Sequence, residues 1–379
     1  MNDPFPQDEL PNRTKTGRGA VGNPAGRFER YQTRAVDDGW SSCAKVTEDL
    51  LAPEPNEEKI QTVLHIDTSR TVINDISSPD LPRYRSINPY RGCEHGCIYC
   101  YARPSHGWLG MGAGLDFETQ IFYKPDAPEI LCRELAAKNY KVQAITLGSN
   151  TDCYQPVERG LKLTRRIIEV LSACNHPLSI ITKSALVTRD IDLLAPMAKK
   201  HLAWVNVSVT TLDPELARVM EPRAAAPWKR LATIKALADA GIPVTVMVAP
   251  LIPALTDMEM DRIMEAAYAA GARSAHYTLV RLPYELKELF AEWLKTHRPE
   301  RADHVLSLIR QTRGGKLYDA DYSQRRRGTG VYADLIAQRF ALARKRIGFD
   351  KDNWKSRWEF ETSLFQPPEQ GGQLNFSFS

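Results

Sequence analysis

Three cysteines, Cys93, Cys97 and Cys100, stand within eight residues of the chain. A fold rarely needs three thiols so close together unless they share a metal, because Val or Leu fills an apolar site equally well. The number is informative, since a structural zinc site closes with four protein ligands and common ferredoxin clusters are held by four thiolates. Three thiolates on a [4Fe–4S] cube would leave one iron open for chemistry. The alternatives are a zinc knuckle completed by His95 or His106, and cysteines that cluster by chance.

The spacing C-x3-C-x2-C, with Tyr99 directly before the third cysteine, resembles that of the radical SAM superfamily. The resemblance implies that the open iron is chelated by the amino and carboxylate groups of S-adenosylmethionine (SAM). One electron would then cleave the sulfonium C–S bond and release a 5′-deoxyadenosyl radical. The cofactors carry that chemistry and the protein positions them. A small one-electron reductant protein, of the flavodoxin or ferredoxin type, is the expected partner.

Within the superfamily, residues 85–285 resemble spore photoproduct lyase and its relatives, often labelled DNA repair photolyases, and above all their uncharacterised branch. The segments that carry this resemblance are Asn150–Glu158, Ile181–Ser184, Asn206–Ser208, Glu221–Arg223 and Ala249–Pro253. The Glu221 and Arg223 pair has two interpretations: it shapes the substrate side of the site, or it is a surface ion pair that contributes little.

The resemblance also implies a SAM site at the ends of the strands. Thr151, with Asp152 beside it, would help to hold the methionine carboxylate, as would the ammonium of Lys183 and the hydroxyl of Ser208. Tyr99 would stack near the adenine. The alternatives are that residues 150–155 form a simple polar turn and that Lys183 is a solvated strand end.

One departure from the lyase concerns hydrogen-atom donation. The lyase carries a cysteine shortly before the hydroxyl residue of this strand end, and the corresponding residue here is Ser149. A serine O–H bond is too strong to donate hydrogen readily to a carbon radical. Cys153 lies a few residues away and is the candidate substitute. The departure argues against repair of thymine dimers in particular and leaves SAM cleavage untouched.

The composition is that of an ordinary globular protein of 379 residues, with 43% hydrophobic and 25% charged residues. The net charge of +4 neither requires nor excludes a nucleic-acid partner. No run approaches the ~18 apolar residues of a transmembrane helix, and the acidic first ten residues do not form a secretory signal. The odd count of seven cysteines fits a reducing compartment. We therefore expect a cytoplasmic protein with no membrane partner.

Short apolar runs alternate with helical patterns through the middle of the chain, which predicts parallel βα units. Six such strands predict a partial (β/α)6 TIM-like barrel, whose active site lies at the carboxyl ends of the strands. Segments 62–66 and 71–74 are expected to form a small strand pair before it. The six barrel strands are predicted at 86–90, 142–147, 178–182, 203–208, 242–248 and 274–280.

Helix signals fall between these strands. Asp213-Pro214-Glu215 combines a capping residue, a proline in the first turn and an acidic residue at the positive end, which predicts a helix start. A single helix is predicted over residues 156–173. The glycine-rich segment Gly107–Gly114 lacks the flanking strand and helix of a phosphate-binding loop, so we expect a flexible connection there.

Residues 12–27 are rich in glycine and basic residues, with little to bury. They predict a poorly ordered tail, with a basic arm that contacts phosphates as the alternative. The expected organisation is a tail over residues 1–60, a radical SAM partial barrel over 61–283, a helical extension over 284–349 and a C-terminal tail over 350–379.

These observations favour a lyase-like radical SAM enzyme that uses a [4Fe–4S] cluster and SAM on an unidentified substrate. Two alternatives remain at this point. One is a DNA photolesion lyase, for which nucleic acid would be the partner. The other is a non-catalytic nucleic-acid-binding protein with a structural metal.

Overall fold

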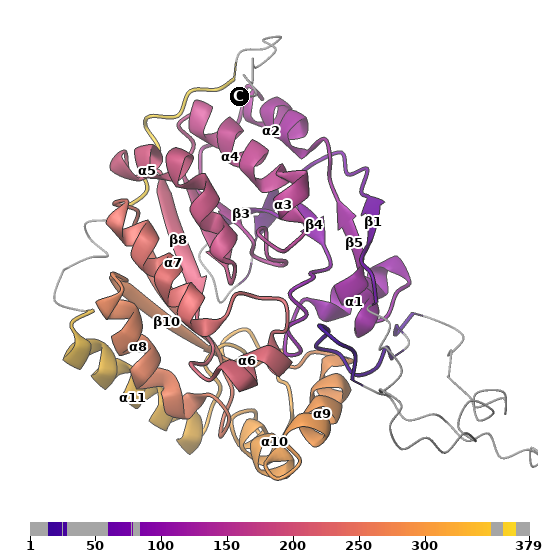
Figure 1. Cartoon of the computed structure of the whole chain (residues 1–379). Coiled ribbons are helices and arrows are strands. Elements are labelled where there is room, and N and C mark those ends of the chain that lie inside the picture. The colour runs from indigo at the N-terminus through magenta and orange to yellow at the C-terminus, as the bar shows by residue number, and fades with distance from the viewer. Residues whose placement is uncertain are drawn as a thin grey trace, which may run out of the picture.

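The computed structural model describes residues 14–24, 26–28, 60–76, 78, 84–349 and 359–368, arranged as in Figure 1. Its main element is a seven-stranded sheet in the order β10-β9-β8-β7-β6-β3-β2. Strand β2 (Asn74–Ile76) runs antiparallel to β3 at one edge, and the other strands are parallel to their neighbours. The parallel strands are β3 (Tyr84–Ile87), β6 (Ile145–Leu147), β7 (Leu178–Thr182), β8 (Ala203–Ser208), β9 (Val244–Leu251) and β10 (Ser274–Leu279).

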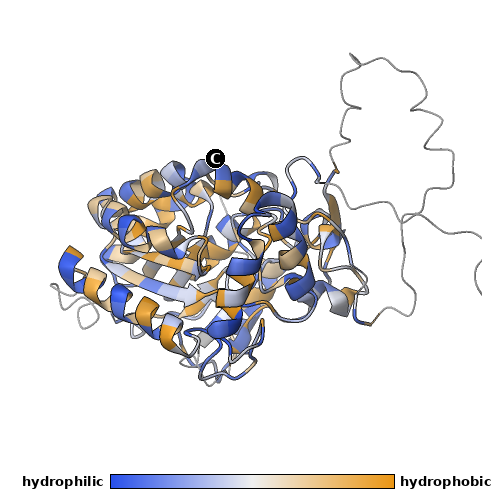
Figure 2. Cartoon of the chain, turned by 90° about the horizontal axis from the view of Figure 1, so that it is seen from below, coloured by the Kyte–Doolittle hydropathy of each residue, from blue (hydrophilic) through white to orange (hydrophobic). Residues whose placement is uncertain are grey.

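Helices lie along the outside of this sheet (Figure 1). Each presents an apolar stripe inward and a polar stripe outward, which is visible in their hydropathy (Figure 2). The buried apolar residues of helices and strands form one large core cluster. The helices are α2 (Ala127–Leu135), α4 (Leu163–Ala173), α5 (Ile191–Lys199), α7 (Pro227–Asp239), α8 (Met260–Ala269) and α11 (Val331–Ile347).

The parallel sheet with alternating helices is the one predicted from the sequence. Strands β7 and β8 have the predicted bounds. The first parallel strand ends at Ile87, earlier than predicted, because Pro89 has no N–H to donate to a neighbouring strand. In its hydrogen bonding the sheet is open, with β10 and β2 at the edges. Curvature into a partial barrel therefore stays a prediction.

A second, three-stranded sheet has the order β1-β5-β4, and it corrects one expectation. The predicted pairing of segments 62–66 and 71–74 is wrong, since β1 (Val63–Ile66) pairs in parallel with β5 (Gln120–Tyr123). Strand β4 (Tyr90–Arg91) pairs antiparallel with β5. The short strand β5 follows helix α1 (Leu115–Thr119) directly, and without a turn signal between them the strand could not be predicted.

Two local predictions need correction. The predicted helix over residues 156–173 is broken into α3 (Glu158–Leu161) and α4, because Lys162 has a φ of 50° and the Glu158 carboxylate caps α4 by accepting from the Thr164 N–H at 3.0 Å. The supposed flexible connection at Gly107–Gly114 begins inside a 3-10 helix, η2 (Arg103–Leu109), in which Arg103 and His106 are buried.

The predicted helical extension is present as α9 (Leu286–His297), α10 (Ala302–Gln311) and α11. Its first two helices form a second apolar cluster, with Phe290 and Trp293 at its centre, that also takes in Cys97 and Tyr99. The extension therefore supports the cysteine loop. Most of the predicted tails, 1–60 and 350–379, lies outside the described residues. None of the helices in the described part of the chain is long and apolar enough to cross a membrane.

Candidate functional site

The three cysteines lie in a loop, here called the cysteine loop (residues 92–100), that follows β4. Neighbouring segments hold its backbone at several points. The Cys93 N–H donates to the carbonyl of Phe117 at 2.9 Å, and the Ile98 N–H donates to the carbonyl of Met220 at 3.1 Å. The Glu94 N–H donates to the side-chain oxygen of Gln155 at 2.9 Å. These contacts fix the loop before any ligand binds.

Arg103, directly after the loop, is completely buried. A guanidinium has five N–H donors in a rigid fork, and its nitrogens make five contacts here. Four are to backbone carbonyls and one is an ion pair. The acceptors are the carbonyls of Gly96, Cys97, Ala113 and Gly114 and the carboxylate of Glu118. Arg103 therefore ties the cysteine loop to the segment before α1.

The buried carboxylate of Glu118 connects the loop to the N-terminal segment. It accepts from the backbone N–H groups of Gly19 at 3.0 Å and Ala20 at 2.8 Å. Residues 18–22 are buried, and Figure 1 shows this indigo segment between α1 and α9. The expectation of a solvated tail does not hold for these five residues, because fixed partners in distant parts of the chain satisfy their polar groups.

The contact between Gly19 and Gly96 depends on the absence of a side chain. A Cβ atom on Gly19 would lie 1.9 Å from the carbonyl oxygen of Gly96. Gly96 itself has a φ of 66°, and a Cβ there would lie 2.8 Å from the Glu118 carboxylate. Two backbones thus approach at a distance that only glycine permits.

We predict that Gly19→Ala releases residues 18–22 from the cysteine loop, because the opposing atoms are backbone atoms that cannot rotate away. Limited proteolysis should then cleave the segment near Arg18 faster than in the unchanged protein. The matched control is Gly160→Ala, where an added Cβ meets nothing within 4 Å. Equal cleavage rates in both variants would contradict the predicted contact.

The thiols of the loop differ in exposure. Cys93 and Cys97 are buried and Cys100 is partly exposed, and none of them forms a disulfide. Burial raises the pKa of Cys93, and the nearby Asp152, Cys97 and Cys100 raise it further. Burial also raises the pKa of Cys97, against the opposing effect of the Lys183 ammonium. Buried thiols of this kind become thiolates only when a cation compensates the charge, and a metal centre provides that.

The donor set of the loop is three thiols, one fewer than a zinc knuckle or a common ferredoxin cluster uses. In the described part of the chain, no three His, Cys, Asp or Glu side chains converge in a way that would hold one metal ion. A zinc knuckle needs four ligands around one ion, whereas three thiolates on a cube each bind a different iron. The two histidines considered as a fourth zinc ligand are engaged by other groups, His95 by the Asp152 carboxylate and His106 by the carbonyl of Gln120.

Comparison with known proteins identifies the family of this chain. Residues 87–267 match the family model described as the radical SAM superfamily. The uncharacterized protein Rv2578c of Mycobacterium tuberculosis is 38% identical over 233 residues, which cover 61% of this chain and 68% of that protein. The uncharacterized protein MJ0683 of Methanocaldococcus jannaschii is 32% identical over 174 residues, covering 46% and 62%. The chain belongs to the radical SAM superfamily.

Solved structures share the radical SAM fold of this chain. A spore photoproduct lyase variant aligns with a TM-score of 0.51 at 16% identity, covering 75% of this chain and 79% of the lyase. A second variant of that enzyme, with bound AdoMet and dinucleoside spore photoproduct, aligns with a TM-score of 0.50 at 14% identity, covering 76% and 79%. At such identities the likeness is one of fold.

Two predicted SAM-binding residues of this radical SAM protein lie together beside the cysteine loop. The Lys183 ammonium lies 5.8 Å from the centre of the Tyr99 ring and is close enough to Cys97 to affect its pKa. Among the described residues Lys183 forms no ion pair with a carboxylate, so its charge is available to a ligand. Membership of the superfamily implies that the protein uses SAM, and a SAM contact for Lys183 stays a prediction.

Asp152 and Thr151 are already engaged by the protein. Asp152 accepts hydrogen bonds from the Thr182 hydroxyl at 2.8 Å and the Lys183 N–H at 2.7 Å, and it pairs with His95 at 3.3 Å. Burial alone would raise the pKa of Asp152, but His95 and the backbone N–H groups of Lys183 and Tyr154 lower it to about 2. The Thr151 hydroxyl donates to the carbonyl of Tyr90. Asp152 thus joins the cysteine loop to the end of β7, and a SAM contact for Thr151 or Asp152 stays a prediction.

Ser208 ends β8 as predicted and is buried, and its carbonyl accepts from Arg230 at 3.2 Å. Beside it lies a group that sequence reasoning missed. Buried Glu221 accepts from the Tyr99 hydroxyl and forms an ion pair with buried Arg230. Arg223 pairs instead with Glu94 of the cysteine loop at 3.0 Å. Neither residue of the predicted Glu221 and Arg223 motif is thus in a simple surface ion pair, and both hold the loop.

Cys153 follows Asp152 and belongs to the hydrophobic core. Its side chain is completely buried in the main core cluster, 3.3 Å from where a Cβ of Gly148 would be. Burial raises the pKa of its thiol well above the ordinary value. A hydrogen-atom donor must reach the substrate, and an enclosed core thiol does not. This burial counts against Cys153 as the substitute donor, and its role stays a prediction.

Proposed function

We propose that this protein is a radical SAM enzyme in which Cys93, Cys97 and Cys100 hold a [4Fe–4S] cluster, and in which the open sheet is the partial barrel of that enzyme class. When bound, the cluster and SAM supply a 5′-deoxyadenosyl radical that abstracts hydrogen from a substrate. The observation that carries the proposal is the fixed three-thiol loop with the Lys183 ammonium beside Cys97, in a chain of this superfamily.

The residues of the chain have distinct tasks in this proposal. Lys183 attracts the methionyl carboxylate of SAM through a charge-assisted contact. Tyr99, held by Glu221, offers an aromatic face near that ammonium. Burial of Cys93 and Cys97 keeps water and oxidants from two of the three thiolates. Arg103 and Asp152 hold the loop against the strand ends.

Anaerobic reconstitution with iron and sulfide tests the proposal. We expect about four irons per chain and formation of 5′-deoxyadenosine after addition of SAM and dithionite. A colourless protein that binds one zinc ion and leaves SAM intact would refute the enzyme assignment and favour the structural-metal alternative.

We predict that Lys183→Met weakens SAM binding to the reconstituted protein by about tenfold or more, because a charged hydrogen-bond partner is worth about 1.5–3 kcal/mol. Equilibrium binding of SAM measures the effect. Lys229→Met, which removes an exposed ammonium on α7, is the matched control. Unchanged SAM affinity in Lys183→Met would remove this residue from the site.

Repair of a DNA photolesion is the second candidate function, and aromatic side chains beside the cysteine loop favour it. Tyr101 follows Cys100, is 42% exposed and has the Arg281 guanidinium 4.1 Å above its ring. Phe28 and Trp108 are exposed and lie 4.7 Å apart. Exposed aromatic faces next to arginine suit a stacked nucleobase. Faster SAM cleavage with UV-irradiated DNA than with undamaged DNA would support this candidate, and equal rates would count against it.

We further propose a flavodoxin-type or ferredoxin-type protein as electron donor and the cytoplasm as the place of action. The support for the location is that the six cysteines in the described residues are free, as expected in a reducing compartment. Reduction of the reconstituted cluster by a purified flavodoxin in place of dithionite tests the donor.

A further inference from the structure

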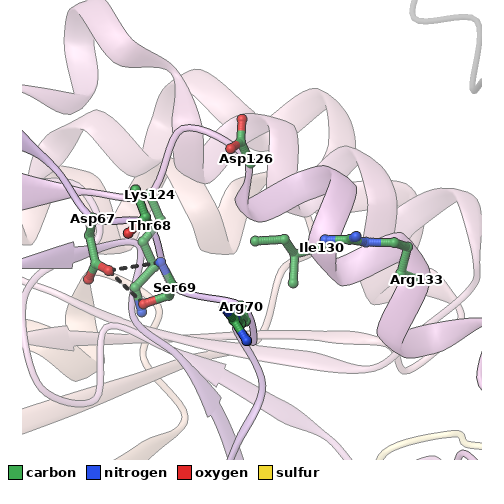
Figure 3. A pocket seen from close by; sticks show the side chains of 8 residues that line it. All are labelled: Asp67, Thr68, Ser69, Arg70, Lys124, Asp126, Ile130 and Arg133. Carbon is green, nitrogen blue, oxygen red and sulfur yellow. Dashed lines mark hydrogen bonds between the residues drawn. The ribbon is translucent and has the colours of Figure 1, made fainter.

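A polar pocket lies at the ends of the small sheet, outside the cysteine loop. Strands β1 and β5 run in parallel and end beside each other, with the Asp67 N–H donating to the carbonyl of Tyr123 at 2.8 Å. The segments that follow these two strands and one side of α2 line a cavity of about 340 Å³ that is open to solvent on one side. Its lining residues are Asp67, Thr68, Ser69, Arg70, Lys124, Asp126, Ile130 and Arg133 (Figure 3).

Three of the lining side chains are cations: Arg70, Lys124 and Arg133. Figure 3 shows Lys124 beside Thr68 and Ser69. In the same view the guanidinium of Arg133 points toward Ile130. Among the residues that the structure describes, none of the three cations makes a hydrogen bond or ion pair. Arg70 and Arg133 are exposed and Lys124 is buried, and an anion bound among them would lower the repulsion between the three charges.

The acidic side chains of the pocket do not cancel this charge. Asp67 pairs with Arg91 at 2.8 Å and also accepts from the Ser69 hydroxyl at 2.6 Å. Asp126 is exposed. With Asp67 neutralised by Arg91, the three cations and Asp126 leave an excess of two positive charges. That excess matches a doubly charged anion.

Lys124 is the most unusual of the three cations. It is only 7% exposed, and a lysine is rarely buried to this degree without a partner. Burial lowers its pKa, although the nearby Asp67 opposes the effect. An anion in the pocket would give this ammonium the partner that the chain itself does not.

We propose that this pocket binds a phosphate dianion, either as inorganic phosphate or as the phosphate group of a small monoester. The cavity is at the small end of the size range of ligand sites. Lysine and arginine are the usual phosphate partners, and the Thr68 hydroxyl lines the same cavity as a further donor. The inference does not depend on SAM chemistry.

Isothermal titration calorimetry on the full chain at constant ionic strength tests the proposal. We expect saturable binding of one inorganic phosphate per chain, weakened about tenfold or more in Lys124→Met. Arg70→Gln, a change at an exposed residue that leaves the core intact, should weaken binding in the same direction. The control Arg262→Gln removes an exposed charge on α8 and should leave the affinity unchanged.

A parallel titration with glycerol 3-phosphate separates the two sources of the dianion. Tighter binding of the monoester than of inorganic phosphate identifies a phosphorylated small molecule, and equal or weaker binding identifies phosphate itself. Absence of saturable binding of either ligand, or equal affinities in Lys124→Met, Arg70→Gln and the unchanged protein, would overturn the proposal.

Discussion

Loss of bound iron and of SAM cleavage is the expected result of Cys97→Ala. Cys97 is the buried thiol beside Lys183, and its removal leaves only Cys93 and Cys100 as loop ligands for a cluster. Two thiolates leave two irons of a cube without protein ligands, so we expect the cluster to be lost. Iron content after anaerobic reconstitution and the rate of 5′-deoxyadenosine formation measure the two effects, and both should fall to background.

Cys132→Ala is the matched control for this substitution. Cys132 is a free, partly buried thiol on α2, remote in sequence from the cysteine loop. Its removal should leave the iron content and the rate of SAM cleavage unchanged. Retention of a full cluster in Cys97→Ala would end the assignment of the three-thiol loop as the metal site.

Arg103→Met is expected to lower the free energy of unfolding by about 3–5 kcal/mol, which is the usual cost of removing one partner of a buried ion pair. Arg103 and Glu118 are both completely buried, so the substitution leaves a buried carboxylate without its cation. It also removes the guanidinium donor from four backbone carbonyls, of which that of Cys97 keeps a second donor, the Cys100 N–H. Urea unfolding of the cluster-free protein measures the change without interference from metal binding.

Two further variants make this prediction specific. Arg103→Lys keeps the charge but has three donors on one nitrogen, so we expect a destabilisation between that of Arg103→Met and none. Arg166→Met removes a partly exposed partner of Glu129 and should cost about 0–1 kcal/mol. If Arg103→Met costs no more than Arg166→Met, Arg103 does not hold the loop in the way described.

The parts of the fold that the sequence predicted well are those set by neighbouring residues. In β8, buried residues alternate with half-buried ones along Ala203–Val207, and this period of two marks a strand directly. Helix α6 (Pro214–Met220) begins where Asp213 caps it, with the carboxylate accepting from the Glu215 N–H at 2.8 Å. The spacing of the three cysteines is local information of the same kind.

The parts that the sequence did not predict depend on partners far away in the chain. Asp152 stands at the expected strand end, but His95 and the Lys183 backbone occupy its carboxylate. A residue's place near a site says nothing about which neighbours already hold its polar atoms. The contact of Gly19 with Gly96 has the same origin, since a glycine-rich segment of low hydrophobicity gives no sign of a distant backbone that fits against it.

The packing of residues 18–22 against the cysteine loop has a consequence for the order in which the protein folds. These residues leave the ribosome first, but their acceptor Glu118 emerges about a hundred residues later, after all three cysteines. During translation the loop is therefore uncovered on this side. The contact between residues 19–20 and Glu118 therefore closes this side of the loop only after all three cysteines have been made.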